Sequence, residues 1–132
     1  MNELRPLTPQ DCLALLGSMS VGRVAFTQDA LPAIRPVNFF LHGEDIIVRT
    51  SPAGTLSELR GQVVAFEVDE IAPDTRTGWS VVAVGKAERV TDVDTLVAVS
   101  DPGHRPWAPG DRSCYLRIPI EILTGREIAL TG

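Results

Sequence analysis

Two apolar runs on either side of a short turn, within residues 35–51, most constrain what this chain can fold into. The segment reads RPVNFFLHGEDIIVRTS, and its β-branched and aromatic residues around a turn at 42–45 are typical of a β-hairpin. Polar residues gather where the two runs end away from the turn. A buried sheet does not require polar residues at these positions, whereas binding of an anionic ligand does. The segment therefore predicts a hairpin that forms part of a binding site, with phosphate as the first candidate anion.

A turn centred on Gly43 and Glu44 sets the register of this hairpin. It places Leu41 opposite Ile46 and Asn38 opposite Arg49, and Val37 then faces Thr50. Because side chains alternate along a strand, the residues divide into two sets. One face carries Pro36, Asn38, Phe40, Ile47, Arg49 and Ser51. The other face carries Arg35, Val37, Phe39, Leu41, Ile46, Val48 and Thr50.

The chemistry of the first face suits a phosphorylated heterocycle. The guanidinium of Arg49 is a planar fork of donors that matches phosphate oxygens, and hydroxyl groups such as that of Ser51 complete an anion site. Asn38 offers both a donor and an acceptor, which fits the amide edge of a flat ring. The alternative interpretation is that Arg35 and Arg49 are ordinary surface residues at strand ends.

The rest of the chain predicts further strands, joined mostly by short turns. We expect strands at 22–27, 32–41, 45–50, 63–69, 78–90, 115–120 and 125–130, with a bulge or bend at Gly85. A helix starts after the cap Thr8, and short helices are expected at 55–60 and 92–99. The predicted fold is mainly β, a small antiparallel barrel with short helices, in one domain spanning 1–132. An open α+β sandwich is the other option.

Composition narrows the partners. The 132 residues carry a net charge of −5, which argues against nucleic acid or an anionic membrane surface. No apolar run is long enough to span a membrane and no signal peptide is indicated, so we expect a cytoplasmic protein. Cys12 and Cys114 match no metal-ligand spacing, and no metal site is expected.

Four segments together resemble the pyridoxamine 5′-phosphate oxidase-like, FMN-binding split-barrel superfamily. They are SVGRVAF, RPVNFFLHGEDIIVRTSPAGT, VVAFEVDEIAPDTRTGWSVVAVGKAERV and CYLRIPIEILTGREI. The resemblance covers nearly the whole chain and is strongest to short members that are described as nitroimidazole-resistance-like or flavin-nucleotide-binding. It implies a homodimer of six- to seven-stranded antiparallel split barrels, with two FMN sites shared at the interface.

The resemblance also implies roles for individual residues. Arg35, Pro36, Val37 and Asn38 would lie along the isoalloxazine ring. Arg49, Thr50 and Ser51 would hold the ribityl-phosphate end. Trp79 and Ser80 would approach the flavin from the partner subunit. Thr55 stands where relatives commonly carry a phosphate-binding lysine, and Arg60 or Arg76 are candidates to replace that lost cation.

The function implied by the resemblance is that of an FMN-dependent oxidoreductase acting on a small-molecule substrate, in which the cofactor carries the redox chemistry. Oxidation of pyridoxamine phosphate itself is not favoured, because the sequence shows no further basic cluster for a second phosphate. Three alternatives stay open. They are a deazaflavin-dependent reductase, a haem-binding split barrel with His42 or His104 as the axial ligand, and a flavin-binding module without enzyme activity.

Overall fold

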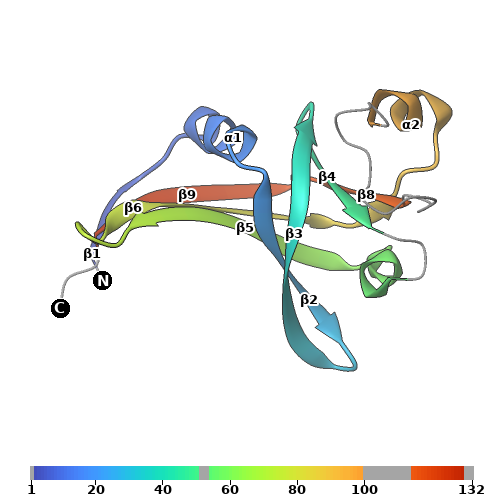
Figure 1. The fold of residues 1–132 in the computed structure, drawn as a ribbon, viewed down its shortest axis with the longest axis horizontal. Coiled ribbons are helices and arrows are strands. Elements are labelled where there is room, and N and C mark those ends of the chain that lie inside the picture. The colour runs from blue at the N-terminus through green and yellow to red at the C-terminus, as the bar shows by residue number, and fades with distance from the viewer. Residues whose placement is uncertain (1, 51–53, 100–113, 130–132) are drawn as a thin grey trace.

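The structure, a computed structural model, describes residues 2–50, 54–99 and 114–129. Within them the chain forms one antiparallel sheet with short helices beside it (Figure 1). In chain order the elements are β1 (Asn2–Pro6), α1 (Pro9–Gly17), β2 (Val21–Gln28), β3 (Leu31–His42), β4 (Asp45–Thr50), the 3₁₀ helix η1 (Thr55–Leu59), β5 (Val63–Ala72), β6 (Thr77–Lys86), β7 (Glu88–Arg89), α2 (Val93–Val99), β8 (Cys114–Pro119) and β9 (Ile122–Ala129).

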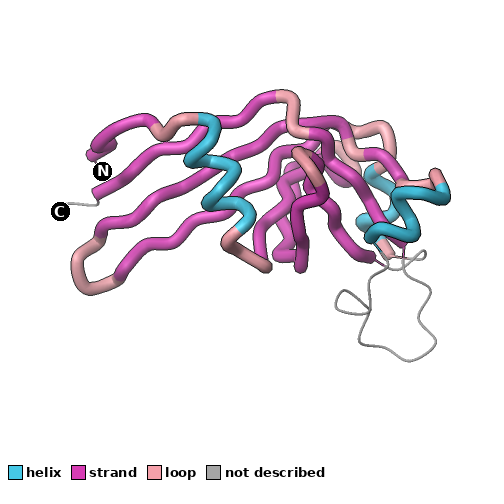
Figure 2. The backbone as a smooth tube through the Cα atoms, turned by 90° about the horizontal axis from the view of Figure 1, so that it is seen from above, coloured by secondary structure: helices cyan, strands magenta, loops and turns pink. Residues whose placement is uncertain are grey.

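The sheet curls into a split barrel, which confirms the predicted fold class. Its strand order is β1-β9-β6-β5-β2-β3-β4-β8-β7, and neighbouring strands run antiparallel. Figure 2 shows α1 lying across the strands of one half, with α2 at the far end of the sheet.

The described chain has nine strands rather than six or seven. Two features account for the difference. β1 pairs with β9 and was not predicted. The predicted strand 78–90 divides into β6 and β7 around Ala87. The β5–β6 register continues through Gly85, so the predicted bulge is absent. A Cβ atom on Gly85 would lie 1.9 Å from the carbonyl oxygen of Pro119, so this glycine lets β6 approach the end of β8.

The register of the β3–β4 hairpin is the predicted one. Leu41 pairs with Ile46 and Phe39 pairs with Val48. Val48 and Phe39 are buried, as expected for the face that points into the barrel. The alternation of side chains predicted from the sequence therefore applies to both strands.

The main core fills the concave side of the sheet. Its largest fully buried side chain is Phe66, which packs edge to face against Phe39 with ring centroids 4.7 Å apart. Helix α1 covers this core with Cys12 and Leu16. As predicted, Thr8 caps the helix, and its hydroxyl oxygen accepts a hydrogen bond of 3.1 Å from the backbone N–H of Asp11.

A smaller core lies on the opposite face of β4 and β8. Ile47, Tyr115, Val90 and Val99 are its buried members, and α2 contributes Val99. This second core means that both faces of β4 are covered next to the hairpin end that carries Arg49.

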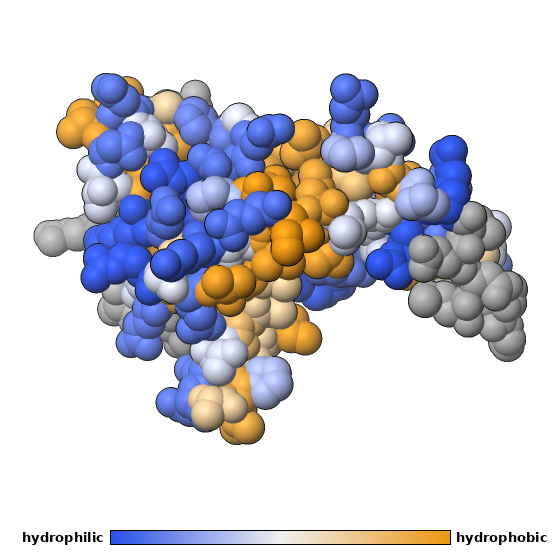
Figure 3. Space-filling view, turned by 180° about the vertical axis from the view of Figure 1, so that it is seen from behind, coloured by the Kyte–Doolittle hydropathy of each residue, from blue (hydrophilic) through white to orange (hydrophobic). Residues whose placement is uncertain are grey.

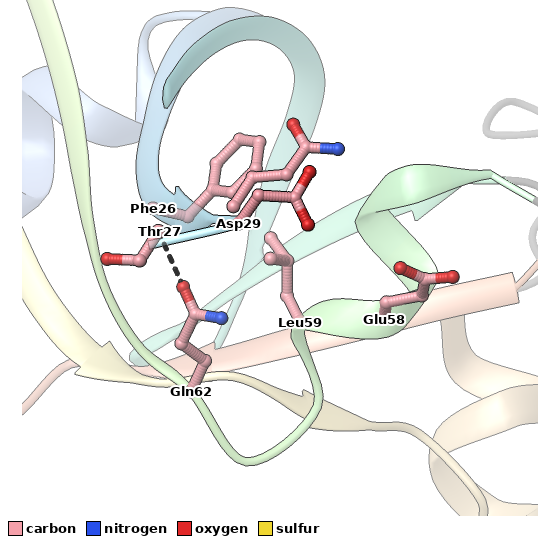
Figure 4. Close-up of a pocket in the computed structure, with 7 residues that line it drawn as sticks. Phe26, Thr27, Asp29, Glu58, Leu59 and Gln62 are labelled. Carbon is pink, nitrogen blue, oxygen red and sulfur yellow. Dashed lines mark hydrogen bonds between the residues drawn. The ribbon is translucent and has the colours of Figure 1, made fainter. Parts of the chain in front are cut away.

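The segment after η1 is fixed to two distant parts of the chain. The side-chain oxygen of Gln62 accepts a 2.7 Å hydrogen bond from the backbone N–H of Thr27 on β2 (Figure 4). Backbone hydrogen bonds of 2.7 and 2.8 Å join Gly61 and Gln62 to Ala87, just before β7. Leu59 is buried beneath the turn. The end of η1 is therefore held next to β7.

None of the helices in the described ranges has the length and apolar character needed to cross a membrane.

Candidate functional site

Arg49 lies at the end of β4, next to the second core. It is half-buried and pairs across the sheet with Tyr115 of β8. Its Nη1 atom is buried and has no hydrogen-bond partner in the part of the chain that the structure describes. A buried guanidinium nitrogen without an acceptor is costly, and an anionic ligand would remove the cost. Residues 51–53, which follow this strand and include the predicted site residue Ser51, lie outside the described residues.

The Arg35–Asn38 stretch forms the middle of β3 and pairs with β2. Val37 points into the core, whereas Arg35, Pro36 and Asn38 are exposed. Because β3 and β4 pair up to Phe39 and Val48, Asn38 and Arg49 are each the next residue on their strands. The β3–β4 pairing ends at Phe39 and Val48, and Asn38 pairs with Val21 of β2, so the grouping of Asn38 and Pro36 with Arg49 in one site stays a prediction.

A cavity of about 220 Å³ adjoins Pro36 on this side of the sheet. Its lining residues are Met19, Val21, Gly22, Arg23, Pro36 and Asp69. Of these residues, only Pro36 was predicted to contact the flavin. The signal that could have found Arg23 is its place in β2, where it stands directly opposite Pro36. The cavity extends the candidate site from β3 onto β2 and β5.

A small charge cluster borders this cavity. Arg23 donates hydrogen bonds to Glu67 at 2.9 Å and to Asp69 at 3.5 Å. Partial burial, together with the neighbouring carboxylate of Asp69, raises the pKa of Glu67 to about 7, although the Arg23 guanidinium opposes the shift. The cluster can therefore take up or release a proton near neutral pH, beside the hairpin.

Two predicted site residues lie elsewhere in the same copy of the chain. Trp79 and Ser80 are on β6, and strands β5 and β2 stand between β6 and β3. Trp79 is half-buried and packs against the main core. Ser80 pairs with Asp69. Their approach to a flavin from a partner subunit stays a prediction, as does a role for Thr55 at the start of η1.

The two histidines weighed as haem ligands fall in different places. His42 is exposed at the turn end of β3, away from the site end of the hairpin. His104 lies outside the described residues.

An antiparallel split barrel with a cation at one hairpin end defines the structural class of this protein. The family model described as pyridoxamine 5′-phosphate oxidase matches residues 8–127. The chain therefore belongs to the pyridoxamine 5′-phosphate oxidase family.

The chain is also similar to individual proteins and solved structures. Uncharacterized protein Rv0080 of Mycobacterium tuberculosis is 39% identical, over 96% of this chain and 86% of its own. The FAD-binding protein from Mycobacterium smegmatis is 27% identical with a TM-score of 0.87, over 96% of this chain and 100% of its own. A FAD-binding protein from Mesorhizobium loti is 26% identical with a TM-score of 0.72, over 95% and 98% of the two chains.

Proposed function

We propose that this protein binds a flavin nucleotide through its FMN portion and acts as an oxidoreductase. The observation that carries the proposal is the buried, unpartnered Nη1 atom of Arg49. Membership of the family and the similarity to two FAD-binding proteins support a flavin as the ligand. A flavin phosphate would supply the acceptor that this guanidinium lacks within the described chain.

The residues around Arg49 fit the remainder of such a ligand. Thr50 follows Arg49 and Thr55 begins η1, and we assign both to the phosphate side of the proposed site together with Ser51, which lies outside the described residues. Arg35, Pro36, Val37 and Asn38 form the β3 stretch proposed for the ring, with the amide of Asn38 available to its polar edge. When bound, a flavin supplies hydride and single-electron transfer, while the protein orients the ring and shields it from water.

We also propose that the protein works as a homodimer, in which Trp79 and Ser80 of a second copy complete each site. An apolar row crosses five strands on the convex face of the sheet, because Ile34, Ala25, Ala65, Val84 and Ile122 pair consecutively. Ile34 and Ile122 are 68% and 58% exposed. Figure 3 shows hydrophobic residues gathered in a continuous area of the surface. Such patches commonly mark an interface, and a second copy would cover this row.

The absorption spectrum of freshly purified protein tests the proposed ligand. Oxidised-flavin bands, or their appearance when flavin-free protein is titrated with FMN, are expected. A Soret band would point instead to haem. Colourless protein that binds neither FMN nor FAD would contradict the proposal. Light scattering tests the dimer, and a monomer at micromolar concentration would contradict the shared site.

A further inference from the structure

Another cavity, which has two arginines in its wall, lies between η1 and β7. Its volume is about 260 Å³, and its lining residues are Ser57, Glu58, Arg60 and Arg89. Arg60 and Arg89 are far apart in the sequence, which is why the sequence shows no basic cluster at this place. Both are exposed, so they can reach a ligand without rearrangement of the core.

The backbone explains why the two arginines meet. Arg60 immediately follows η1, and the next residue, Gly61, donates a 2.7 Å hydrogen bond to the carbonyl oxygen of Ala87. Ala87 in turn donates to the carbonyl oxygen of Gln62 at 2.8 Å. Arg89 lies two residues beyond Ala87, in β7. The convergence of the arginines is thus built into a hydrogen-bonded pair of segments.

The two arginines that line this cavity differ from three other arginines of the described chain, whose charges are balanced by ion pairs. Arg5, Arg23 and Arg117 each form ion pairs with carboxylates. Within the described ranges, Arg60 and Arg89 form none, even with Glu58 on the same cavity wall. Two like charges that line one cavity repel each other, and an anion between them would relieve that repulsion. Guanidinium forks match phosphate oxygens in both geometry and charge.

The cavity is close to the proposed flavin phosphate. Arg89 pairs with Leu116, and Leu116 pairs with Val48, the residue before Arg49. Two strand spacings of about 4.8 Å separate the backbones of Arg89 and Val48. Alternation places Arg89 and Arg49 on opposite faces, so a ligand would pass around the strand end to reach both.

We propose that this cavity is a second phosphate subsite, which binds a phosphate group beyond that of FMN. The inference rests on the proposed flavin function and deepens it. The group could belong to the adenylate half of FAD or to a separate phosphorylated ligand, and the shared chemistry is a phosphate held between Arg60 and Arg89.

The test measures the affinities of FMN, FAD and ADP by calorimetry or by flavin fluorescence. ADP is titrated into both flavin-free and FMN-loaded protein. The variants are Arg60→Gln, Arg89→Gln, their double variant, and the matched control Glu58→Gln, which removes a negative charge from the same cavity. All three side chains are exposed, so the variants are expected to fold.

If the phosphate belongs to FAD, each arginine variant lowers the affinity for FAD by about threefold to fivefold, and the double variant lowers it by about tenfold or more. The affinity for FMN is unchanged. Glu58→Gln strengthens FAD, and added salt reduces all these differences. If the phosphate belongs to a separate ligand, the same losses appear for ADP, and FAD binds no differently from FMN.

Two results would overturn the subsite. One is that the double variant leaves FAD and ADP binding unchanged. The other is that the double variant lowers the affinity for FMN as much as that for FAD, which would assign the arginines to the FMN phosphate. A wild-type protein that binds neither FMN nor FAD would contradict the flavin proposal instead. In that case, equal ADP affinity in wild type and double variant would overturn the subsite as well.

Discussion

Arg49 and Arg117 occupy the same face of two adjacent strands, yet their surroundings are opposite in character. Arg49 pairs with Tyr115, and Arg117 pairs two residues away with Ile47. The Arg117 guanidinium lies 3.2 Å from Glu88, 3.8 Å from Asp92 and 3.9 Å from Asp45. The Arg49 guanidinium forms no ion pair within the described residues and buries one nitrogen.

The comparison separates two uses of the same side chain. Arg117 is surrounded by carboxylates from β4, β7 and the start of α2, so its charge helps to hold these elements together. Arg49 lies next to the apolar second core, where a cation without a partner among the described residues would lower stability and a bound anion would restore it. Position on the sheet does not distinguish the two arginines. The acids around them do.

The largest expected effect follows from removing Arg49. Arg49→Ala should weaken FMN binding by about 2–5 kcal/mol, because a desolvated charge loses its phosphate partner. Arg49→Lys keeps the charge but loses the planar fork, and should fall between wild type and alanine. Fluorescence titration of flavin-free protein measures both. Unchanged FMN affinity in Arg49→Ala would remove this residue from the site.

Arg117→Ala should have the reverse profile. We expect a loss of about 1–2 kcal/mol in the free energy of unfolding, because three carboxylates lose their shared cation in a partly buried setting. FMN affinity should stay the same. Urea unfolding measures the free energy of unfolding, and fluorescence titration measures the FMN affinity. A variant that keeps its stability but loses FMN would erase the distinction between the two arginines.

Arg23 lies between these two cases, because it borders the candidate site as Arg49 does and is paired with carboxylates as Arg117 is. The pH dependence of the free energy of unfolding tests this charge cluster. The pKa of Glu67, about 7 in the folded state, stands above its ordinary value of 4.5. The stability associated with protonated Glu67 is therefore fully present below pH 4.5 and is lost as pH rises through 7. Wild type should lose about 1 kcal/mol relative to Glu67→Gln between pH 5 and 8, a figure reduced for solvent screening of a side chain that is 31% exposed.

Urea unfolding of wild type and Glu67→Gln at the two pH values measures this difference. Asp69→Asn is the matched variant, because removing the neighbouring carboxylate should lower the pKa of Glu67 and shrink the effect. Parallel pH profiles for wild type and Glu67→Gln would contradict the raised pKa of Glu67.

The hairpin was predictable because its information is local. The turn at Gly43 and the alternation of apolar residues set its register, which runs from the Phe39–Val48 pair to the His42–Asp45 pair as predicted. Strand β1 was missed because its pairing with β9 joins the two ends of the chain, which no local pattern records.

Features that depend on contacts between residues far apart in the chain could not be predicted from local sequence patterns. The Arg23–Glu67 pair needs the β2–β5 register, and the Arg60–Arg89 cavity needs the hydrogen bonds between Gly61 and Ala87. The lack of a carboxylate partner for Arg49 among the described residues also became visible only in three dimensions, because it depends on which side chains lie nearby.

A crystal structure of the protein grown with FMN tests the central claim most directly. The account predicts that the flavin phosphate lies within hydrogen-bond distance of Arg49 Nη1, that the ring lies along residues 35–38, and that a second copy covers the site. An FMN phosphate bound away from Arg49, with Nη1 still lacking an acceptor, would contradict it.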